Sequence, residues 1–169
     1  IDVFGRTAVM QAHSVGMHCD REPIADALLE AAEGRLDHVY YKSETTLPFK
    51  ADLHQQNGFL RGETTADVAC ENGLNFHIDW LHGQKTGFFV DQRENRTLLE
   101  HYSRDRAVLN MFCYTGGFSV YAMRGGARLV HSVDASAQAV ELTRQNIALN
   151  FPDDPRHEAY AEDAFRFLE

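Results

Sequence analysis

The sequence lacks the features that mark membrane-spanning, exported and zinc-binding proteins. No apolar run approaches the roughly 18 residues that a membrane helix needs, so no membrane span is expected. No basic start precedes a short apolar stretch, so no signal peptide is expected either. The three cysteines, Cys19, Cys70 and Cys113, form no C-x-x-C pair, which excludes a zinc knuckle and favours a reducing, cytoplasmic location.

Basic residues are also scarce. Lys and Arg number 16 against 25 acids, which gives a net charge of −9. Residues 1–72 hold 6 basic and 12 acidic residues, a net of −6, and residues 73–169 hold 10 and 13, a net of −3. An acidic surface does not favour non-specific binding of nucleic acid. An RNA partner would therefore need a local basic patch or another part of the protein.

The first 72 residues are predicted to form a small α/β domain. Strands are expected at residues 6–13, 37–42, 58–62 and 68–71, a helix at 22–32, and a long polar loop at 43–56. His13, His18, Cys19 and Asp20 gather in one short stretch. Their spacing fits a loop before a helix, with Asp20 as its N-cap, better than a metal site, so no metal is expected.

The centre of the sequence, residues 107–134, is predicted to be a strand, a glycine turn, a helix and a second strand. A glycine turn lets a ligand approach the backbone, and an acid at the tip of the next strand can hold two ribose hydroxyls. Asp134 lies 18 residues beyond Gly116 and suits that role. Tyr114 stands where G-x-G-x-x-G has its first glycine, which disfavours a pyrophosphate and favours the phosphate-free cofactor S-adenosylmethionine (SAM). A plain turn with nothing bound is the structural alternative.

Two further stretches are candidates for the same site. A helix at 135–150 and a third parallel strand at 157–161 place Asp163 on the ligand-binding edge, where it can accept from an adenine amino group or simply cap a helix. Polar residues also gather in residues 82–96, between a strand at 74–81 and a helix that begins at Asp91. The alternative for this stretch is a capping network, in which Asp91 is the N-cap and Arg93 and Arg96 pair with Glu94 and Glu100.

Several long motifs resemble one family of enzymes. They are AVMQAHSVGM, ENGLNFHIDW, GQKTGFFVDQRENR, VLNMFCYTGGFSVYAMRGGA, SVDASAQAVELTRQNIALN and EDAF. Together they resemble the SAM-dependent RNA methyltransferases that make 5-methylcytosine in bacterial large-subunit ribosomal RNA. Members of that family have an N-terminal PUA domain for RNA, a small central α/β domain and a C-terminal Rossmann-like catalytic domain. The resemblance implies an α/β chain with the central domain at 1–72 and, at 73–169, a hairpin and the first half of the catalytic domain with its parallel sheet.

The resemblance also implies which residues bind SAM. Related uracil-5 methyltransferases carry D-x-F-C-G-x-G where this sequence has NMFCYTG, so Asn110 replaces the acid and Tyr114 the first glycine. The implied contacts are Phe112, Tyr114, Thr115 and Gly116 at the methionine end, Asn110 in the same motif, Asp134 at the ribose, Asp163 and Ala164 at the adenine, and Lys85, Asp91, Gln92 and Arg93 on the N-terminal side.

The family's chemistry uses a cysteine thiolate that adds to C6 of cytosine, so that C5 takes the methyl group from SAM before a base removes the C5 proton. That cysteine follows a D-P-P motif on the fourth strand, and the resemblance places both beyond Glu169. No catalytic residue is therefore expected in this chain, and Cys113 is not assigned that role. The start without Met and the end inside a predicted helix suggest a fragment. Alone, it is expected to be inactive and to bind SAM weakly or not at all.

The expected partner is ribosomal RNA, through the absent N-terminal domain and the catalytic cleft, with no membrane partner. The sequence leaves the oligomeric state open, a homodimer included. Two other functions are weighed: an NAD-dependent oxidoreductase, which Tyr114 makes a poor fit, and a non-catalytic domain that interacts with RNA or protein.

Overall fold

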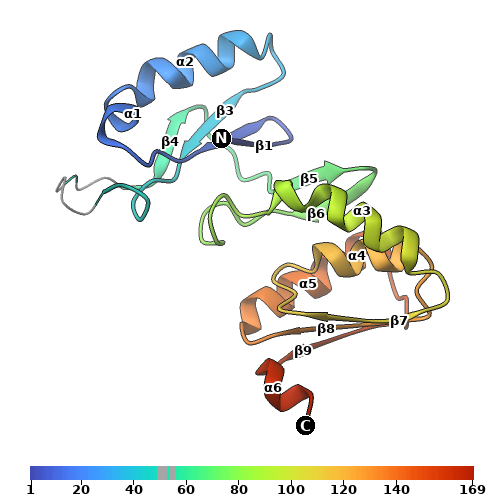
Figure 1. Cartoon of the computed structure of the whole chain (residues 1–169). Coiled ribbons are helices and arrows are strands. Elements are labelled where there is room, and N and C mark those ends of the chain that lie inside the picture. Colours follow the sequence, from blue (N-terminus) through green and yellow to red (C-terminus); the bar gives the residue numbers. More distant parts are fainter. Residues whose placement is uncertain (49–52, 54–55) are drawn as a thin grey trace. The chain divides into compact units, whose positions relative to one another are not determined.

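The computed structural model describes residues 1–48, 53 and 56–169, and these form two compact units (Figure 1). Unit 1 holds residues 1–69 and 78–88, and unit 2 holds residues 70–77 and 89–169. The stretch 78–88 therefore belongs with the N-terminal unit, although it follows part of unit 2 in the sequence. The domain boundary expected between residues 72 and 73 stays a prediction.

Unit 1 is a four-stranded sheet with helices between its two parallel strands. Its elements are β1 (Asp2–Phe4), β2 (Thr7–Met10), α1 (Val15–Cys19), α2 (Arg21–Ala31), β3 (His38–Tyr41) and β4 (Gly58–Arg61). The strands lie in sequence order, and only β2 and β3 are parallel. A parallel pair needs a long crossover connection, which α1 and α2 supply.

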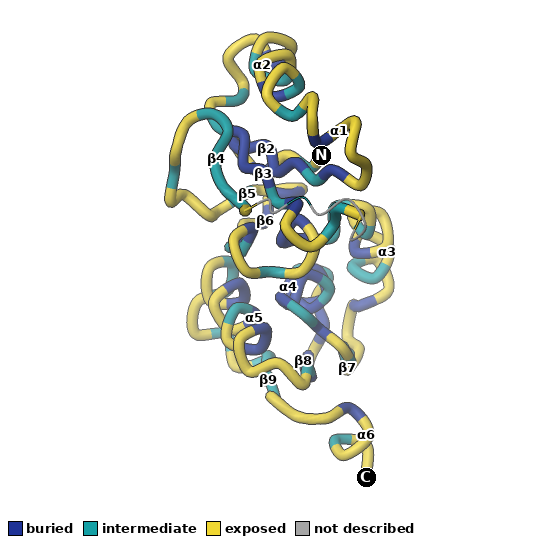
Figure 2. The backbone as a smooth tube through the Cα atoms, turned by 90° about the vertical axis from the view of Figure 1, so that its left-hand side faces the viewer, coloured by how far each residue is buried: buried dark blue, intermediate teal, exposed yellow. Residues whose placement is uncertain are grey.

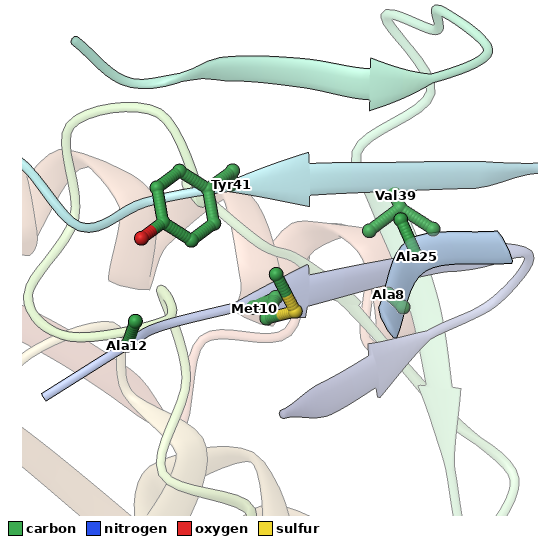
Figure 3. Packing of buried hydrophobic residues seen from close by; sticks show 6 residues of the cluster. All are labelled: Ala8, Met10, Ala12, Ala25, Val39 and Tyr41. Atoms are coloured by element: carbon green, nitrogen blue, oxygen red, sulfur yellow. The ribbon is translucent and has the colours of Figure 1, made fainter. Parts of the chain in front are cut away.

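The core of unit 1 lies between α2 and this sheet. Ala25 of α2 packs with residues of β2 and β3, among them Met10, Val39 and Tyr41 (Figure 3). His18 is buried, and its Nδ1 atom lies 2.9 Å from the hydroxyl of Tyr41. The role of His18 in unit 1 is therefore to satisfy a buried hydroxyl.

The structure corrects two expectations for unit 1 and describes a third only in part. The stretch 13–20, expected as a loop, contains α1, which Ser14 caps by accepting a hydrogen bond from the Met17 amide. Asp20 does stand at the N-cap position of α2, but its side chain makes no capping hydrogen bond. The loop expected at residues 43–56 falls partly outside the described residues.

Unit 2 is a Rossmann-like β-α-β-α-β unit. It contains β7 (Ala107–Met111), α4 (Gly117–Arg124), β8 (Leu129–Asp134), α5 (Ala137–Asn150), β9 (His157–Ala161) and α6 (Ala164–Phe167). The three strands are parallel in the order β7-β8-β9, which confirms the predicted parallel sheet. Helices α4 and α5 lie on one face of this sheet, and α4 is buried along most of its length (Figures 1 and 2).

A hairpin links the two units in the sequence. Its strands are β5 (Val68–Glu71) and β6 (Leu74–His77), and the turn residues Asn72 and Gly73 have φ angles of 51° and 80°. Both angles are left-handed, as a type I′ turn requires, so the Asn-Gly signal is confirmed. Strand β6 is shorter than the expected strand at 74–81, because from Ile78 onward the chain packs in unit 1.

A buried carboxylate joins the end of this hairpin to the helices of unit 2. Those helices include the short η2 (Val90–Gln92) and α3 (Arg93–Tyr102). Glu71 accepts two hydrogen bonds of 2.9 Å from Arg96, one of 3.0 Å from Arg93 and one of 2.9 Å from the hydroxyl of Tyr121 on α4. Glu71 and Arg96 are 7% and 2% exposed. One carboxylate thus connects β5, α3 and α4.

The partners of Glu71 also set its ionisation. Burial alone would raise the pKa of Glu71, but the hydrogen bonds from Arg96 and Arg93 outweigh burial, so its pKa lies below the ordinary value. The capping network proposed for this region is wrong, because Arg93 and Arg96 pair with Glu71 instead of Glu94 and Glu100. No helix in the described part of the chain is long and apolar enough to cross a membrane.

We expect the Glu71→Gln substitution to destabilise unit 2 by about 3–5 kcal/mol, because it leaves the buried Arg96 cation without a carboxylate. The lowered pKa of Glu71 means that its contribution is complete above the ordinary carboxyl pKa of about 4.3 and is lost as the pH falls through the folded-state value. Chemical unfolding measured from pH 7 to pH 3 should therefore show a weaker acid dependence in Glu71→Gln than in the wild type.

Glu100→Gln is the matched control for this prediction. Glu100 pairs with Arg124 at 2.6 Å, but both side chains keep about a quarter of their surface exposed. Removing this partly exposed pair should cost roughly 1 kcal/mol. Equal losses in the two variants would contradict the role assigned to burial at Glu71.

Candidate functional site

The turn between β7 and α4 has an unusual backbone. Phe112, Tyr114 and Gly116 have φ angles of 57°, 50° and 75°, so every second residue is left-handed. This conformation is ordinary for glycine but costs a residue with a side chain roughly 1 kcal/mol or more. Phe112 is also 73% exposed. Strained residues of this kind gather at functional sites, so the turn is the first candidate.

Side chains of helix α5 donate hydrogen bonds to two carbonyl oxygens of this turn. The Thr143 hydroxyl donates to the carbonyl oxygen of Tyr114 at 2.9 Å, and the Asn146 side-chain amide donates to that of Thr115 at 2.8 Å. A Cβ atom on Gly116 would lie 2.5 Å from the Thr143 methyl group. Gly116 is therefore required both by its φ angle and by the close approach of α5.

Asp134 ends β8 directly beside the turn. Its Oδ2 atom accepts from the Tyr114 amide at 2.9 Å, and its Oδ1 atom accepts from the Ser136 amide at 2.9 Å. Each carboxylate oxygen has a second lone pair, so Asp134 can hold the turn and still accept from a ligand hydroxyl. The structure thus brings Asp134 together with the residues of the glycine turn, and the ribose role stays a prediction.

Asp163 lies at the end of the neighbouring strand. Its Oδ1 atom accepts from the amides of Phe165 and Arg166 at 3.0 and 3.2 Å, so the side chain caps α6, as the structural alternative proposed. The Glu162 amide donates to the carbonyl oxygen of Asp134 at 3.0 Å, which keeps the ends of β8 and β9 side by side. Ala164 follows Asp163 and is buried. The adenine role of this pair stays a prediction.

Asn110 begins a row of polar side chains that runs across the sheet from β7 to β9. Its amide nitrogen lies 2.8 Å from the Ser119 hydroxyl, which lies 2.7 Å from that of Ser132. The Ser132 hydroxyl in turn lies 2.8 Å from Nε2 of His157. Burial, followed by the nearby His131, lowers the pKa of His157 to about 4, so the imidazole is neutral at pH 7. The row is therefore uncharged and links β7, α4, β8 and β9.

The N-terminal members of the predicted set are divided between the units. Lys85 belongs to unit 1, in a left-handed conformation with φ of 48°. Asp91 and Gln92 lie in η2, where Gln92 accepts from Asn95, while Arg93 donates to Glu71. Phe89 precedes η2, and the centre of its ring lies 5.5 Å from the centre of the Tyr114 ring, so this segment approaches the turn. All predicted residues other than Lys85 lie in unit 2.

Cys113 lies within the turn but is not an activated thiol. It is 6% exposed, and its sulfur lies 3.7 Å from the Thr143 hydroxyl. Burial raises the pKa of Cys113 to about 11, so the thiol stays protonated at neutral pH. A nucleophilic cysteine needs the opposite shift.

Thr143 and Asn146 belong to this site but are not among the residues that the sequence motifs predict. Both are polar residues on the buried face of α5, where apolar residues are normal. Buried polar side chains are nearly always hydrogen-bonded, so two of them on one face indicate a specific partner.

Comparison with known proteins gives concordant results. Residues 47–167 match the family model described as S-adenosylmethionine-dependent methyltransferase. The ribosomal RNA large subunit methyltransferase I of Alteromonas mediterranea is 38% identical over 169 residues, which are 99% of this chain and 42% of that protein. The chain thus spans about two-fifths of the length of this relative.

Solved structures share the fold. A protein from Streptococcus mutans, assigned as a SAM-dependent methyltransferase, superposes with a TM-score of 0.83 at 26% identity, over 99% of this chain and 43% of its own. A methyltransferase structure complexed with SAH gives the same TM-score and identity, over 42% of its own chain. These matches confirm the expected Rossmann-like fold and the cofactor class. Since the family model covers residues 47–167, most of the sequence, the chain belongs to the S-adenosylmethionine-dependent methyltransferase family.

Proposed function

We propose that the protein methylates C5 of cytosine in large-subunit ribosomal RNA with SAM as the methyl donor. The observation that carries the proposal is the strained turn after β7, with the Asp134 carboxylate bonded to it. The relative from Alteromonas mediterranea, named a ribosomal RNA large subunit methyltransferase I, supports RNA as the substrate. The cytosine-5 specificity follows from the motif resemblance, and a cytoplasmic location belongs to the same proposal.

The residues of unit 2 would hold the cofactor across the ends of the three parallel strands. Asp134 would accept from the ribose hydroxyls, and Asp163 with Ala164 would lie at the adenine. The turn residues Phe112 and Tyr114 carry large side chains where a dinucleotide site has bare backbone, which favours a cofactor without phosphates over NAD. When bound, SAM supplies an electrophilic methyl group, and these residues position it.

The attacking thiolate is a separate requirement. Cys113, buried and protonated, does not meet it. We therefore propose that the nucleophile is not among the site residues of unit 2, and that the 169 residues alone transfer no methyl group to RNA. A radiolabelled methyl-transfer assay on transcribed ribosomal RNA tests this, and appreciable turnover by the chain alone would refute it.

Asp134→Ala should weaken SAM binding by about 1–3 kcal/mol, because hydrogen bonds between a charged group and the ribose would be lost. A ¹H–¹⁵N titration measures this even where binding is weak, and NAD should produce no shifts at the turn. Glu141→Ala, which removes an exposed acid on α5, is the control and should leave the affinity unchanged. Unchanged affinity in a folded Asp134→Ala variant would remove Asp134 from the site.

Cys113 should resist modification in the folded chain. The exposed Cys19 and Cys70 are expected to react with an aromatic disulfide reagent at pH 8, whereas Cys113 should react only after denaturation, because burial keeps its thiol protonated. Counting the aromatic thiolate that the reagent releases, before and after denaturant is added, gives the number of reactive cysteines in each state. Reaction of all three thiols at similar rates would instead make Cys113 a candidate nucleophile.

A further inference from the structure

We propose that Thr143 and Asn146 are positioning residues for the cofactor: from α5 they aim the backbone of the turn after β7 at the bound SAM. The inference rests on the proposed function, because it assigns a purpose to contacts beneath the same site. Both side chains are fully buried, at 0% exposure. Neither would touch the cofactor, since each acts through a backbone carbonyl of the turn.

The hydrogen bonds from α5 fix the direction of the peptide groups in the turn. Thr143 and Asn146 bind two successive carbonyl oxygens, those of Tyr114 and Thr115. In a trans peptide the N–H points opposite to the C=O. Fixing these carbonyls toward α5 therefore turns the amides of Thr115 and Gly116 away from it. The Gly116 amide donates back to the carbonyl of Cys113 at 2.9 Å, so the bonds from α5 fix the direction of the Thr115 amide, in a residue that is 2% exposed.

Thr143 also limits the turn sterically. The methyl group of Thr143 lies where a side chain on Gly116 would have to go, at 2.5 Å from the ideal Cβ position. Thr143 therefore excludes a side chain at Gly116 through its methyl group and orients the turn through its hydroxyl. Of these two groups, serine retains the hydroxyl, which orients the turn, and valine retains only the methyl group.

Asn146 differs from Asn150, four residues further along α5, in one contact. Asn146 accepts from the His77 amide of β6 at 2.7 Å and donates to the turn. Asn150 also bonds to the hairpin, accepting from the Asn75 amide at 2.8 Å and donating to its carbonyl at 2.7 Å. Both asparagines join α5 to β6, but the contact with the turn belongs to Asn146. Asn150 is therefore a matched control for stability without positioning.

The test measures SAH affinity by ¹H–¹⁵N titration and thermal stability in parallel, with the full chain and four variants. Thr143→Val keeps the shape but loses the donor, and Asn146→Ala loses the second donor. Each should weaken SAH binding by about tenfold, the equivalent of one hydrogen bond. Thr143→Ser keeps the hydroxyl and should bind within about twofold of the wild type. Asn150→Ala should lower the melting temperature yet also bind within about twofold.

The possible outcomes distinguish the positioning role of Thr143 and Asn146 from the proposed function. Wild-type affinity in Thr143→Val and Asn146→Ala overturns the positioning role and leaves the proposed function in place. An equal loss in Asn150→Ala, or no rescue in Thr143→Ser, also overturns it, because the effect would then follow general stability. Absence of measurable SAH binding by the wild-type chain overturns this inference, because the turn then positions no cofactor. It does not overturn the proposed function, which expects the 169 residues alone to bind SAM weakly or not at all. If Asn146→Ala does not fold, the Thr143→Val and Thr143→Ser pair gives the same decision.

Discussion

The carbonyl groups of the turn after β7 are the constraint on which unit 2 depends. A chain that changes handedness at alternate residues cannot satisfy its carbonyls through a regular ladder, and buried carbonyls without partners are costly. Side chains of α5 supply the missing donors, so the turn, α4 and α5 must form together. The close approach of α5 then excludes any side chain at Gly116. Local strain is thus offset by contacts that the rest of the unit provides.

Helix α4, which follows the turn, is also bound to carboxylates of β5 and α3. Tyr121 of α4 donates to the buried Glu71, and the guanidinium of Arg124 lies 4.8 Å from the centre of the Tyr121 ring. Arg96 completes the Glu71 pair from α3. A buried carboxylate with several charge-assisted donors tolerates little movement, because any displacement leaves an unpaired charge in the interior. Helix α4 is therefore held by the turn at its start, by the Tyr121–Glu71 hydrogen bond and by the Arg124–Glu100 ion pair at its end.

The local pattern of the sequence was sufficient for the parts of this fold that are built from neighbours. The Asn72-Gly73 turn and the strand-turn-helix-strand unit ending at Asp134 were predicted because turn chemistry and apolar periodicity act over a few residues. The partners of Arg93 and Arg96 were predicted wrongly, since Glu71 is more than twenty residues away. Helix α1 was missed because a single serine, Ser14, caps five residues without a periodic pattern.

Tyr114 departs from the G-x-G-x-x-G motif, yet its contacts join the turn to the rest of unit 2. A tyrosine in a left-handed conformation is less stable than glycine, yet its ring contacts Phe89, its amide bonds to Asp134, and its carbonyl bonds to Thr143. Glycine would keep the bonds to Asp134 and Thr143. It would lose the ring contact with Phe89, which joins the turn to the segment before η2. A phosphate-binding turn needs that space to be empty, whereas a phosphate-free cofactor does not. The substitution that weakens the dinucleotide interpretation therefore also explains how the turn is joined to its surroundings.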